Sequence, residues 1–505
     1  MNDSRKSSFD RLALAGTVLA YVVLAARRLD VPIPGIDEVI YVPTALGVLR
    51  IAGAGHVRGL PLMLSEYVGC PMSYVLAPVF GLWGVGVETM RLPAIAVALA
   101  AVLTFIYLIS KIFPRVPLWA PAAACLLNST FLISSRMGLY ADVSIHWLLL
   151  SLTLLCLWKW SLTRRPIHAF LAFVCVGFGI YSKIIFVWFA FPAALVVAYA
   201  SRRDGRAARA RLAGLCALGF VLGALPLLID NVDSGWKTAA LIRDHLVIPA
   251  ESDLPSNLSL FQNLATRSEH LLMLLTGSFQ FPSGTLATFD GMAFLILFGA
   301  VFFLFREEKQ RAALAAAGAF IAAFFFGSML TISSRIPLHL HPILSPILLL
   351  GGVALAKLIP ARFPLLLACL LLLLPQLDHF NAYLRSNAQA TDERSSRALS
   401  SLSDFLSTEG AAHPMVALDA GLGPRLFVAS GGKVSAENDF ISDRPQSLKP
   451  GSMAICLWEP PSPFKPRLGC GRLLSDSSFR LGEIRKFPAA PDPPVYAAIT
   501  VLGIR

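Results

Sequence analysis

The strongest constraint on this chain is a series of long apolar runs that contain no Asp, Glu, Lys or Arg. A helix needs about 20 apolar residues to cross the hydrocarbon core of a bilayer, with about 17 as the lower limit. Only 15% of the 505 residues are charged, whereas soluble domains carry roughly 25% charged residues. We therefore expect an all-α polytopic membrane protein with about eleven transmembrane helices. The runs cover residues 12–26, 92–110, 116–135, 143–158, 166–182, 184–201, 212–229, 291–305, 312–334, 336–356 and 363–377.

Lys and Arg in the short connections between these runs predict the orientation in the membrane. Cytoplasmic loops carry an excess of Lys and Arg, and basic connections alternate along the chain with connections that hold only Arg136, Lys183 or Arg335. We expect a multi-pass protein of the plasma (inner) membrane with a cytoplasmic N-terminus. Arg27 and Arg28, directly after the first run, are exceptions. Since the basic residues lie between apolar runs, the net charge of +12 does not indicate nucleic-acid binding. The basic connections are 111–115, 159–165, 202–211, 306–311 and 357–362.

Three long segments then fall on the extracytoplasmic side, namely 27–91, 230–290 and 378–505. The first two are amphipathic, and aromatic residues such as Tyr67 and Trp83 predict helices that lie on the bilayer surface and contact membrane lipids.

Residues 378–505 predict a small α/β domain outside the membrane, after a transmembrane catalytic module of residues 1–377. A polar helical stretch and short apolar strands are separated by Pro and Gly. Two cysteines of this segment share an oxidising compartment, so a disulfide is one prediction and a pair of free thiols is the other. The helical stretch is 392–408, the strands are 415–418 and 453–458, and the cysteines are Cys456 and Cys470.

Charged residues at the outer ends of the apolar runs predict a functional site. Three lone cations share the extracytoplasmic side with three carboxylates. A charge at membrane depth costs about 2.5–3.5 kcal/mol, and such charges usually mark a site. A single cation there is more often a nonspecific ligand of lipid headgroups, but the convergence of six charges favours a functional site. The cations are Arg136, Lys183 and Arg335, and the acids are Asp37, Glu38 and Asp142.

This set of charges suits sugar transfer from a polyprenyl-phosphate carrier. Cations stabilise the charge that develops on a leaving phosphate, and a carboxylate can take the proton of the acceptor hydroxyl. The pair Asp37-Glu38 can also begin a helix, where acids complement the helix dipole, and the two roles are compatible.

Short motifs across residues 30–350 give the chain a family resemblance. It resembles the GT-C glycosyltransferases, close to the group of protein O-mannosyltransferases and lipid A aminoarabinose transferases. The resemblance implies a GT-C-like fold and a glycosyltransferase that uses a lipid-phosphate donor. The motifs are Asp37-Glu38 followed by Tyr41, Glu66-Tyr67-Val68-Gly69-Cys70-Pro71 up to Tyr74, Arg91-Leu92-Pro93, Arg136 with Asp142, Tyr181-Ser182-Lys183, Arg243-Asp244-His245, and His341-Pro342 followed by Ser345-Pro346.

The resemblance also implies roles for individual residues. Asp37 is the expected base of an inverting hexosyl or pentosyl transfer, and Glu38 or Asp142 orients the acceptor, which is a lipid, a glycan or a protein. One departure is Cys70, where some relatives have Lys, and this weakens the assignment to the aminoarabinose group. The expected ligands of the carrier phosphate are Arg136, Lys183, Arg243 and Arg335, and the remaining expected substrate-binding residues are Arg58, Glu66, Tyr67, His245 and His341.

Histidines on the same side raise the question of a metal. His245, His339 and His341, with Glu66, are residue types that ligate Zn²⁺. Their spacing is dispersed, and hydrogen bonding to phosphate or sugar is the preferred interpretation, so we expect no required cofactor, with a divalent metal as the alternative.

Two other classes of membrane protein remain open. A transporter or flippase for lipid-linked saccharides would use the same cations without a base, but such proteins often show paired, interrupted half-repeats, and none is visible. A ligase or polymerase of lipid-linked glycans would lack the pair Asp37-Glu38.

Overall fold

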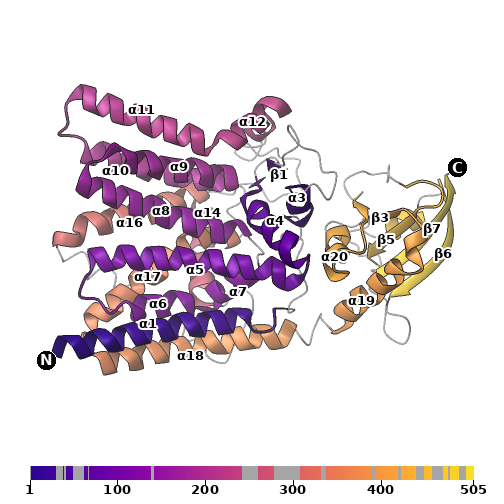
Figure 1. The fold of residues 1–505 in the computed structure, drawn as a ribbon, viewed down its shortest axis with the longest axis horizontal. Helices are drawn as coiled ribbons and strands as arrows, with labels where there is room; N and C mark the ends of the chain where they lie inside the picture. The colour runs from indigo at the N-terminus through magenta and orange to yellow at the C-terminus, as the bar shows by residue number, and fades with distance from the viewer. Residues whose placement is uncertain are drawn as a thin grey trace.

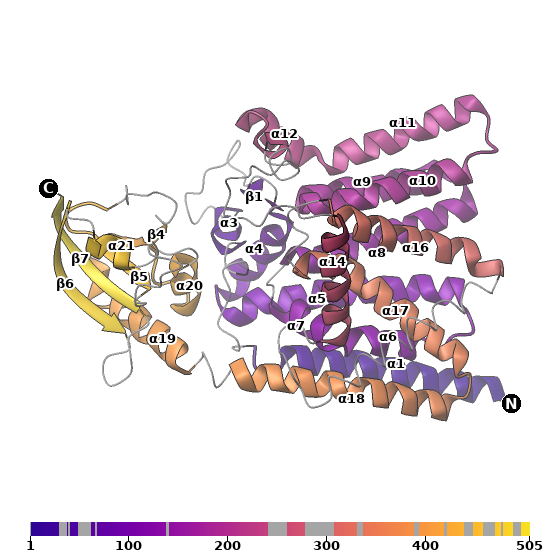
Figure 2. The ribbon, with the colours of Figure 1, turned by 180° about the vertical axis from the view of Figure 1, so that it is seen from behind.

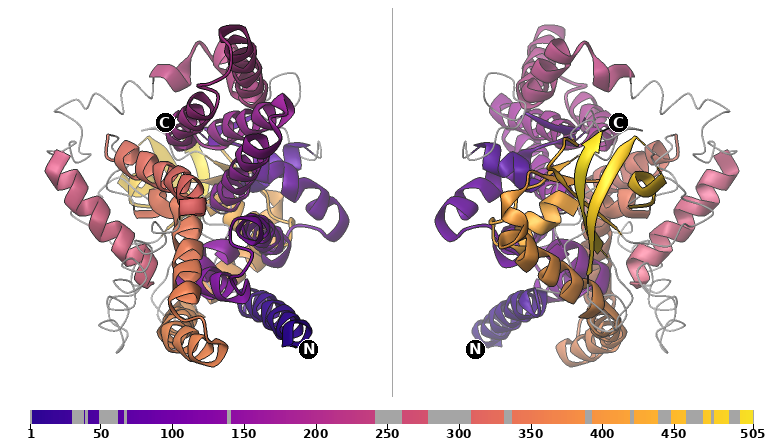
Figure 3. Two further views of the ribbon diagram at one scale, coloured as in Figure 1. Left: turned by 90° about the vertical axis from the view of Figure 1, so that its left-hand side faces the viewer. Right: turned by 90° about the vertical axis from the view of Figure 1, so that its right-hand side faces the viewer.

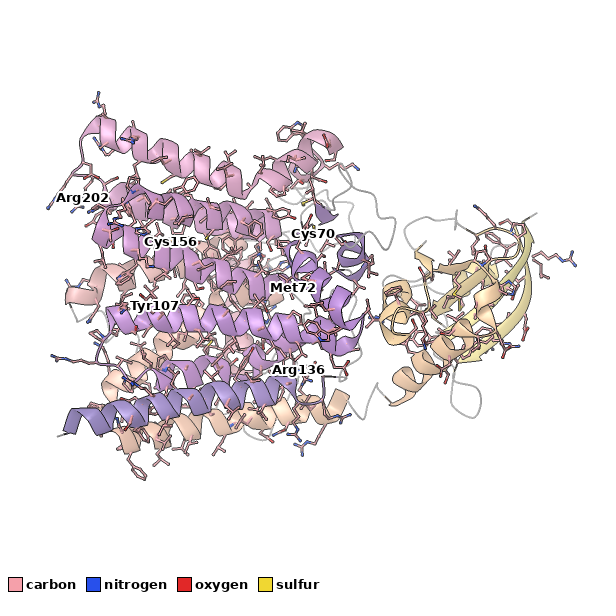
Figure 4. The ribbon with its side chains drawn as sticks, in the orientation of Figure 1. Cys70, Met72, Tyr107, Arg136, Cys156 and Arg202 are labelled. Carbon is pink, nitrogen blue, oxygen red and sulfur yellow. A yellow bond between two sulfur atoms is a disulfide. The ribbon has the colours of Figure 1, made fainter. Side chains whose placement is uncertain are left out.

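The fold consists of a bundle of helices with a small sheet domain at one end (Figure 1). We call the end of the bundle near the N-terminus and Arg202 the N-terminal end, and the end near Cys70 and Arg136 the domain end (Figure 4). The computed structural model describes residues 2–29, 38, 41–48, 62–65, 68–137, 141–240, 260–277, 308–330, 337–387, 393–418, 422–438, 448–457, 470–475, 478–487 and 496–504.

Six helices in the described part are long and apolar enough to cross a membrane. A seventh crossing is formed if α11 (Arg206–Gly223) and α12 (Leu225–Ser234), bent by 62° at their junction, are one broken span. The polytopic helical architecture is therefore confirmed, while the number of eleven spans is not; the run 291–305 lies outside the described residues. The six helices are α1 (Asn2–Ala26), α5 (Val87–Ile112), α8 (Ala141–Thr163), α16 (Glu308–Ser328), α17 (His341–Leu358) and α18 (Arg362–Asn387).

Several apolar runs form shorter helices instead of one span. The run 116–135 divides into α6 (Trp119–Leu126) and α7 (Ser129–Met137). Asn128 stands between them, and its Oδ1 accepts a hydrogen bond from Phe131 N at 3.1 Å, which caps the second helix. Likewise α9 (Pro166–Ser182) is followed directly by the 3₁₀ turn η1 (Ile184–Phe189) and α10 (Ala190–Ala200), with Lys183 at the junction.

Glycines bring α9 and α11 close together. A Cβ at Gly177 would lie 2.2 Å from Phe220 O, and one at Gly223 would lie 2.2 Å from Val174 O. Small residues at helix crossings let backbones approach closely inside a membrane, where van der Waals packing drives association. This packing fixes the end of α9, on which Lys183 depends.

The domain end carries short elements between the spans. The helix α3 (Tyr41–Val48) packs on α4 (Pro71–Trp83), and Ser73 Oγ donates to Tyr41 O at 3.0 Å. Figure 2 shows α14 running across the spanning helices instead of along them. The remaining elements here are β1 (Met63–Ser65), β2 (Val68–Gly69), α14 (Leu260–Thr276) and the 3₁₀ turn η3 (Pro337–Leu340).

The C-terminal domain is a five-stranded mixed sheet in the order β4-β3-β5-β7-β6. The pairs β4-β3 and β3-β5 are parallel, and β5-β7 and β7-β6 are antiparallel. Alternate residues of β5 face opposite sides: Ile455 packs with α19 and α20, and Cys456 packs with α21. Its elements are α19 (Glu393–Ser407), η5 (Gly410–Ala412), β3 (Met415–Ala417), α20 (Leu422–Ala429), β4 (Glu437–Asn438), β5 (Met453–Leu457), α21 (Cys470–Ser475), β6 (Phe479–Phe487) and β7 (Tyr496–Ile504).

This domain matches the expected α/β character, and its two cysteines are joined. Cys456 and Cys470 form a disulfide between β5 and α21, so the first of the two alternatives holds. The domain lies over the domain end of the bundle (Figure 3), and Val428 of α20 is buried in the core of the bundle. The preceding span α18 runs to Asn387, past residue 377.

Candidate functional site

A fully buried ion pair anchors the domain end. Arg91, near the start of α5, donates from Nε to Glu38 Oε1 at 2.5 Å and from Nη2 to Glu38 Oε2 at 2.8 Å. Neither side chain is exposed. Two parallel hydrogen bonds of this kind fix the relative orientation of both groups as well as binding them. Glu38 therefore has a defined position, immediately after Asp37 in the chain.

The same arginine also holds the end of α1. Arg91 Nη1 donates to Leu29 O, and Arg136 Nη2 donates to Arg27 O at 2.8 Å and to Arg28 O. The last carbonyls of a helix have no partner inside the helix, and its C-terminus carries partial negative charge, so cations stabilise it. Arg28 has φ 51°, a left-handed conformation common where helices end. Arg91 thus ties Leu29 to Glu38 and fixes both ends of the segment that contains Asp37.

Arg136 and His341 are linked through helix α7, which carries Arg136 and also contacts His341. Arg136 ends α7 in the interior, with its guanidinium carbon 5.6 Å from the centre of the Phe380 ring. Two residues earlier on the same helix, Ser134 Oγ hydrogen-bonds His341 Nε2 at 2.7 Å, and Trp147 Nε1 donates to His341 O at 2.7 Å. His341, expected to bind substrate, is fully buried and connects α7, α8 and α17.

Lys183 lies at the junction of α9 and η1 with a half-buried side chain. Its backbone pairs with Val68 of β2 in an antiparallel bridge, so the first outer segment lies against this junction. In the described part of the chain, no hydrogen bond or ion pair engages the Lys183 ammonium. A half-buried ammonium that has no carboxylate partner among the described residues is suited to bind an added anion.

Cys70 packs against the same junction. Its backbone N lies 3.4 Å from the Tyr181 hydroxyl, to which it donates, and its Sγ lies 3.4 Å from that hydroxyl. A Cβ at Gly69 would lie 2.3 Å from Tyr181 O, so only glycine permits this close approach. The position where some relatives have Lys is therefore filled by a buried thiol in contact with Tyr181. Nearby on α4, partial burial, with a smaller effect of Cys70, raises the pKa of Tyr74 above its ordinary value.

One further cation at the domain end was not singled out from the sequence. Arg267 on α14 is fully buried, and its Nη2 donates to Ser328 O at 3.3 Å. Asn263, one turn earlier, donates to Met329 O at 2.9 Å. Burial lowers the pKa of Arg267 to about 9, which leaves it charged at neutral pH. The spacing of Asn263 and Arg267, four residues apart on one helix face, is the only sequence signal that identifies them.

Several predicted site residues lie outside the described residues. For Asp142 the structure gives the backbone, in the first turn of α8, and not the side chain. Among the described residues, no group of three His, Cys, Asp or Glu side chains could hold a metal ion. The predicted residues outside the description are Asp37, Arg58, Glu66, Tyr67, Arg243, His245 and Arg335.

Two solved structures share this architecture over nearly the whole chain. The crystal structure of ArnT from Cupriavidus metallidurans bound to undecaprenyl phosphate has a TM-score of 0.63 and 14% identity, over 96% of this chain and 97% of that one. The apo structure of the same protein has a TM-score of 0.61 and 12% identity, over 98% of both chains. The chain has the ArnT fold. The resemblance that the motifs predicted is thereby confirmed for the fold. No protein-family model and no curated protein sequence matches the chain.

Proposed function

We propose that this chain is a membrane glycosyltransferase that moves a sugar from a polyprenyl-phosphate carrier to a lipid, glycan or protein acceptor at the outer face of the membrane. The observation that carries the proposal is the half-buried Lys183 ammonium, which has no anionic partner in the described part of the chain. It stands at the domain end of a fold shared with an ArnT that binds undecaprenyl phosphate. A carrier phosphate is an anion of the kind that Lys183 requires.

The proposed reaction is a single displacement at the anomeric carbon. The acceptor hydroxyl oxygen forms the new bond to that carbon, and the bond from the carbon to the phosphate oxygen breaks on the opposite side, so the configuration inverts. The electron pair leaves with the polyprenyl phosphate, whose negative charge Lys183 stabilises. The proton of the acceptor goes to the Asp37 carboxylate.

The buried ion pair supports Asp37 as the base. Arg91 contacts both Leu29 and Glu38, so the segment between them has fixed ends. A base must be held within hydrogen-bond reach of the proton that it takes, and the contacts of Arg91 with Leu29 and Glu38 favour such a fixed position. In this proposal Glu38 acts through Arg91 as a positioning residue for Asp37, and orientation of the acceptor is left to Asp142.

The distribution of cations supports an extracytoplasmic site. Arg202 lies at the N-terminal end, opposite Arg136 and Cys70 (Figure 4). Basic loops mark the cytoplasmic side, and the loop around Arg202 is the most basic of the chain. The domain end, and with it the C-terminal domain, is therefore assigned to the outside.

Purified protein reconstituted with sugar-loaded undecaprenyl phosphate tests the proposal. We expect a new glycosidic product whose anomeric configuration is opposite to that of the donor, with release of undecaprenyl phosphate. Vesicles that moved the intact donor between leaflets, with no glycosidic product for any envelope lipid, glycan or protein offered as acceptor, would identify a flippase instead.

A further inference from the structure

A buried histidine lies beside the Lys183 junction and takes no part in the proposed reaction. His146 is on α8, one turn after Asp142, and only 1% of its surface is exposed. Its ring packs against Phe186 of η1, with 5.1 Å between the ring centres. A polar ring this deep in the bundle costs free energy unless its nitrogens find partners.

One nitrogen of His146 is satisfied and the other is not. The ring hydrogen-bonds the Gly179 backbone, while Nε2 is covered by protein and has no hydrogen-bond partner among the residues that the structure describes. The bonded nitrogen is therefore Nδ1, which donates to a carbonyl and leaves Nε2 as an acceptor. A ring nitrogen buried without a hydrogen bond is uncommon and requires an explanation.

Lys183 offers a donor at the same turn of α9. Its backbone N donates to the Gly179 carbonyl at 3.0 Å, so His146 and Lys183 meet at the same residue of α9. Lys183 is also near enough for its charge to act on the His146 ring. The lysine side chain is long and rotates freely, so its ammonium is able to turn toward Nε2 or to reach it through one water.

We propose that His146 is a positioning residue that accepts a hydrogen bond from the Lys183 ammonium, directly or through one water, and holds it where the carrier phosphate binds. This inference rests on the proposed function. Because protein covers Nε2, His146 cannot contact the carrier and acts only through Lys183. In the low-dielectric interior, a neutral acceptor of this kind orders the ammonium without cancelling its charge.

Binding of undecaprenyl phosphate to the full-length protein in lipid nanodiscs tests the inference. We expect His146→Leu, which removes the acceptor, to raise Kd by about three- to tenfold, the loss typical of one ordinary hydrogen bond, because His146 acts on the carrier only through Lys183. His146→Gln retains an acceptor and should restore most of the affinity. Lys183→Ala should weaken binding more, and His146→Leu should add nothing in the Lys183→Ala background.

Controls separate this role from a merely structural one. Thr153→Val removes a buried polar group from the same helix and should leave Kd unchanged. If His146→Leu does not fold, His146→Met takes its place. Normal affinity of a folded His146→Leu protein, absence of rescue by Gln, or a full additional loss in the Lys183→Ala background would each overturn the role of His146. Normal affinity of Lys183→Ala would instead contradict the proposed function itself.

Discussion

The two ends of the helical bundle differ in how far their ion pairs are exposed to solvent. At the N-terminal end, Arg362 and Asp10 form an ion pair, with Nη2 and Oδ2 2.6 Å apart, but their side chains remain 33% and 27% exposed. At the domain end, Arg91 and Glu38 form a pair of similar geometry with no exposure at all. Cations in water serve topology and solubility, whereas desolvated charges are expensive and persist where many contacts hold them. The comparison supports the proposal that the chemistry of this protein takes place at the domain end.

The largest expected effect is that reporters fused to the two ends of the bundle lie on opposite sides of the membrane. A reporter fused after Arg209, in the basic connection at the N-terminal end, should behave as cytoplasmic, and one fused after Asp392 should behave as external. Paired activities of alkaline phosphatase and a fluorescent protein measure this. A cytoplasmic location after Asp392 would place the C-terminal domain and the site on the wrong side.

Replacement of Asp37 by Asn should nearly abolish transfer. The amide keeps the shape of the carboxylate but cannot accept the acceptor proton, and loss of a general base costs about 10²–10⁴-fold in rate. The measurement is the initial rate with sugar-loaded undecaprenyl phosphate. Asp233→Asn, which alters an exposed acid on α12, is the matched control and should leave the rate unchanged. A wild-type rate for folded Asp37→Asn protein would remove Asp37 from the mechanism.

Breaking the buried ion pair should destabilise the protein more than any change at the N-terminal end. Arg91→Met leaves the Glu38 carboxylate buried without its partner, which typically costs about 3–5 kcal/mol of stability. The double variant Arg91→Met with Glu38→Leu removes both charges and should recover much of that loss. Thermal unfolding in detergent measures both. Equal losses in the single and double variants would show that the unpaired charge is not the cause.

Removal of the Lys183 ammonium should slow turnover at limiting donor while leaving stability near that of the wild type. Loss of a charge-assisted contact costs about 1.5–3 kcal/mol, roughly ten- to a hundredfold, and Lys183→Arg should retain part of the activity. Lys111→Ala, in the last turn of α5 at the N-terminal end of the bundle, is the control because its side chain is exposed. Equal rates for the Lys183→Ala and Lys111→Ala proteins would contradict the assignment of a phosphate site at Lys183.

The smallest effect is expected for the partly exposed pair of Arg362 and Asp10. Arg362→Met removes a partly solvated contact, and such pairs contribute about 0–1 kcal/mol. Thermal unfolding should shift little, and transfer should be unaffected. A loss of stability as large as that of Arg91→Met would show that the ion pairs at the two ends of the bundle contribute equally.

The membrane character and the segments of the C-terminal domain could be predicted from the amino-acid sequence alone. Apolar length and helical or alternating periodicity are local properties, so they can be recognised without any knowledge of contacts. The stretch 392–408 became α19, and the segments 415–418 and 453–458 became β3 and β5. The apolar pattern did not show the break at Asn128, because the Asn128 amide is also held by Leu275 O and Gln376 Oε1, which are distant in the sequence.

The contacts between charged and polar groups could not be predicted from the sequence and became visible in the folded chain. Arg91 appeared in the sequence as the start of a span, yet it binds Glu38, 53 residues earlier. Arg136 was expected at the carrier phosphate, and in the structure it donates to the carbonyls of Arg27 and Arg28, directly after α1. The contact of His341 with Ser134 spans 207 residues. Side chains so far apart along the chain leave no periodic trace, because their contact depends on the packing of whole helices in three dimensions.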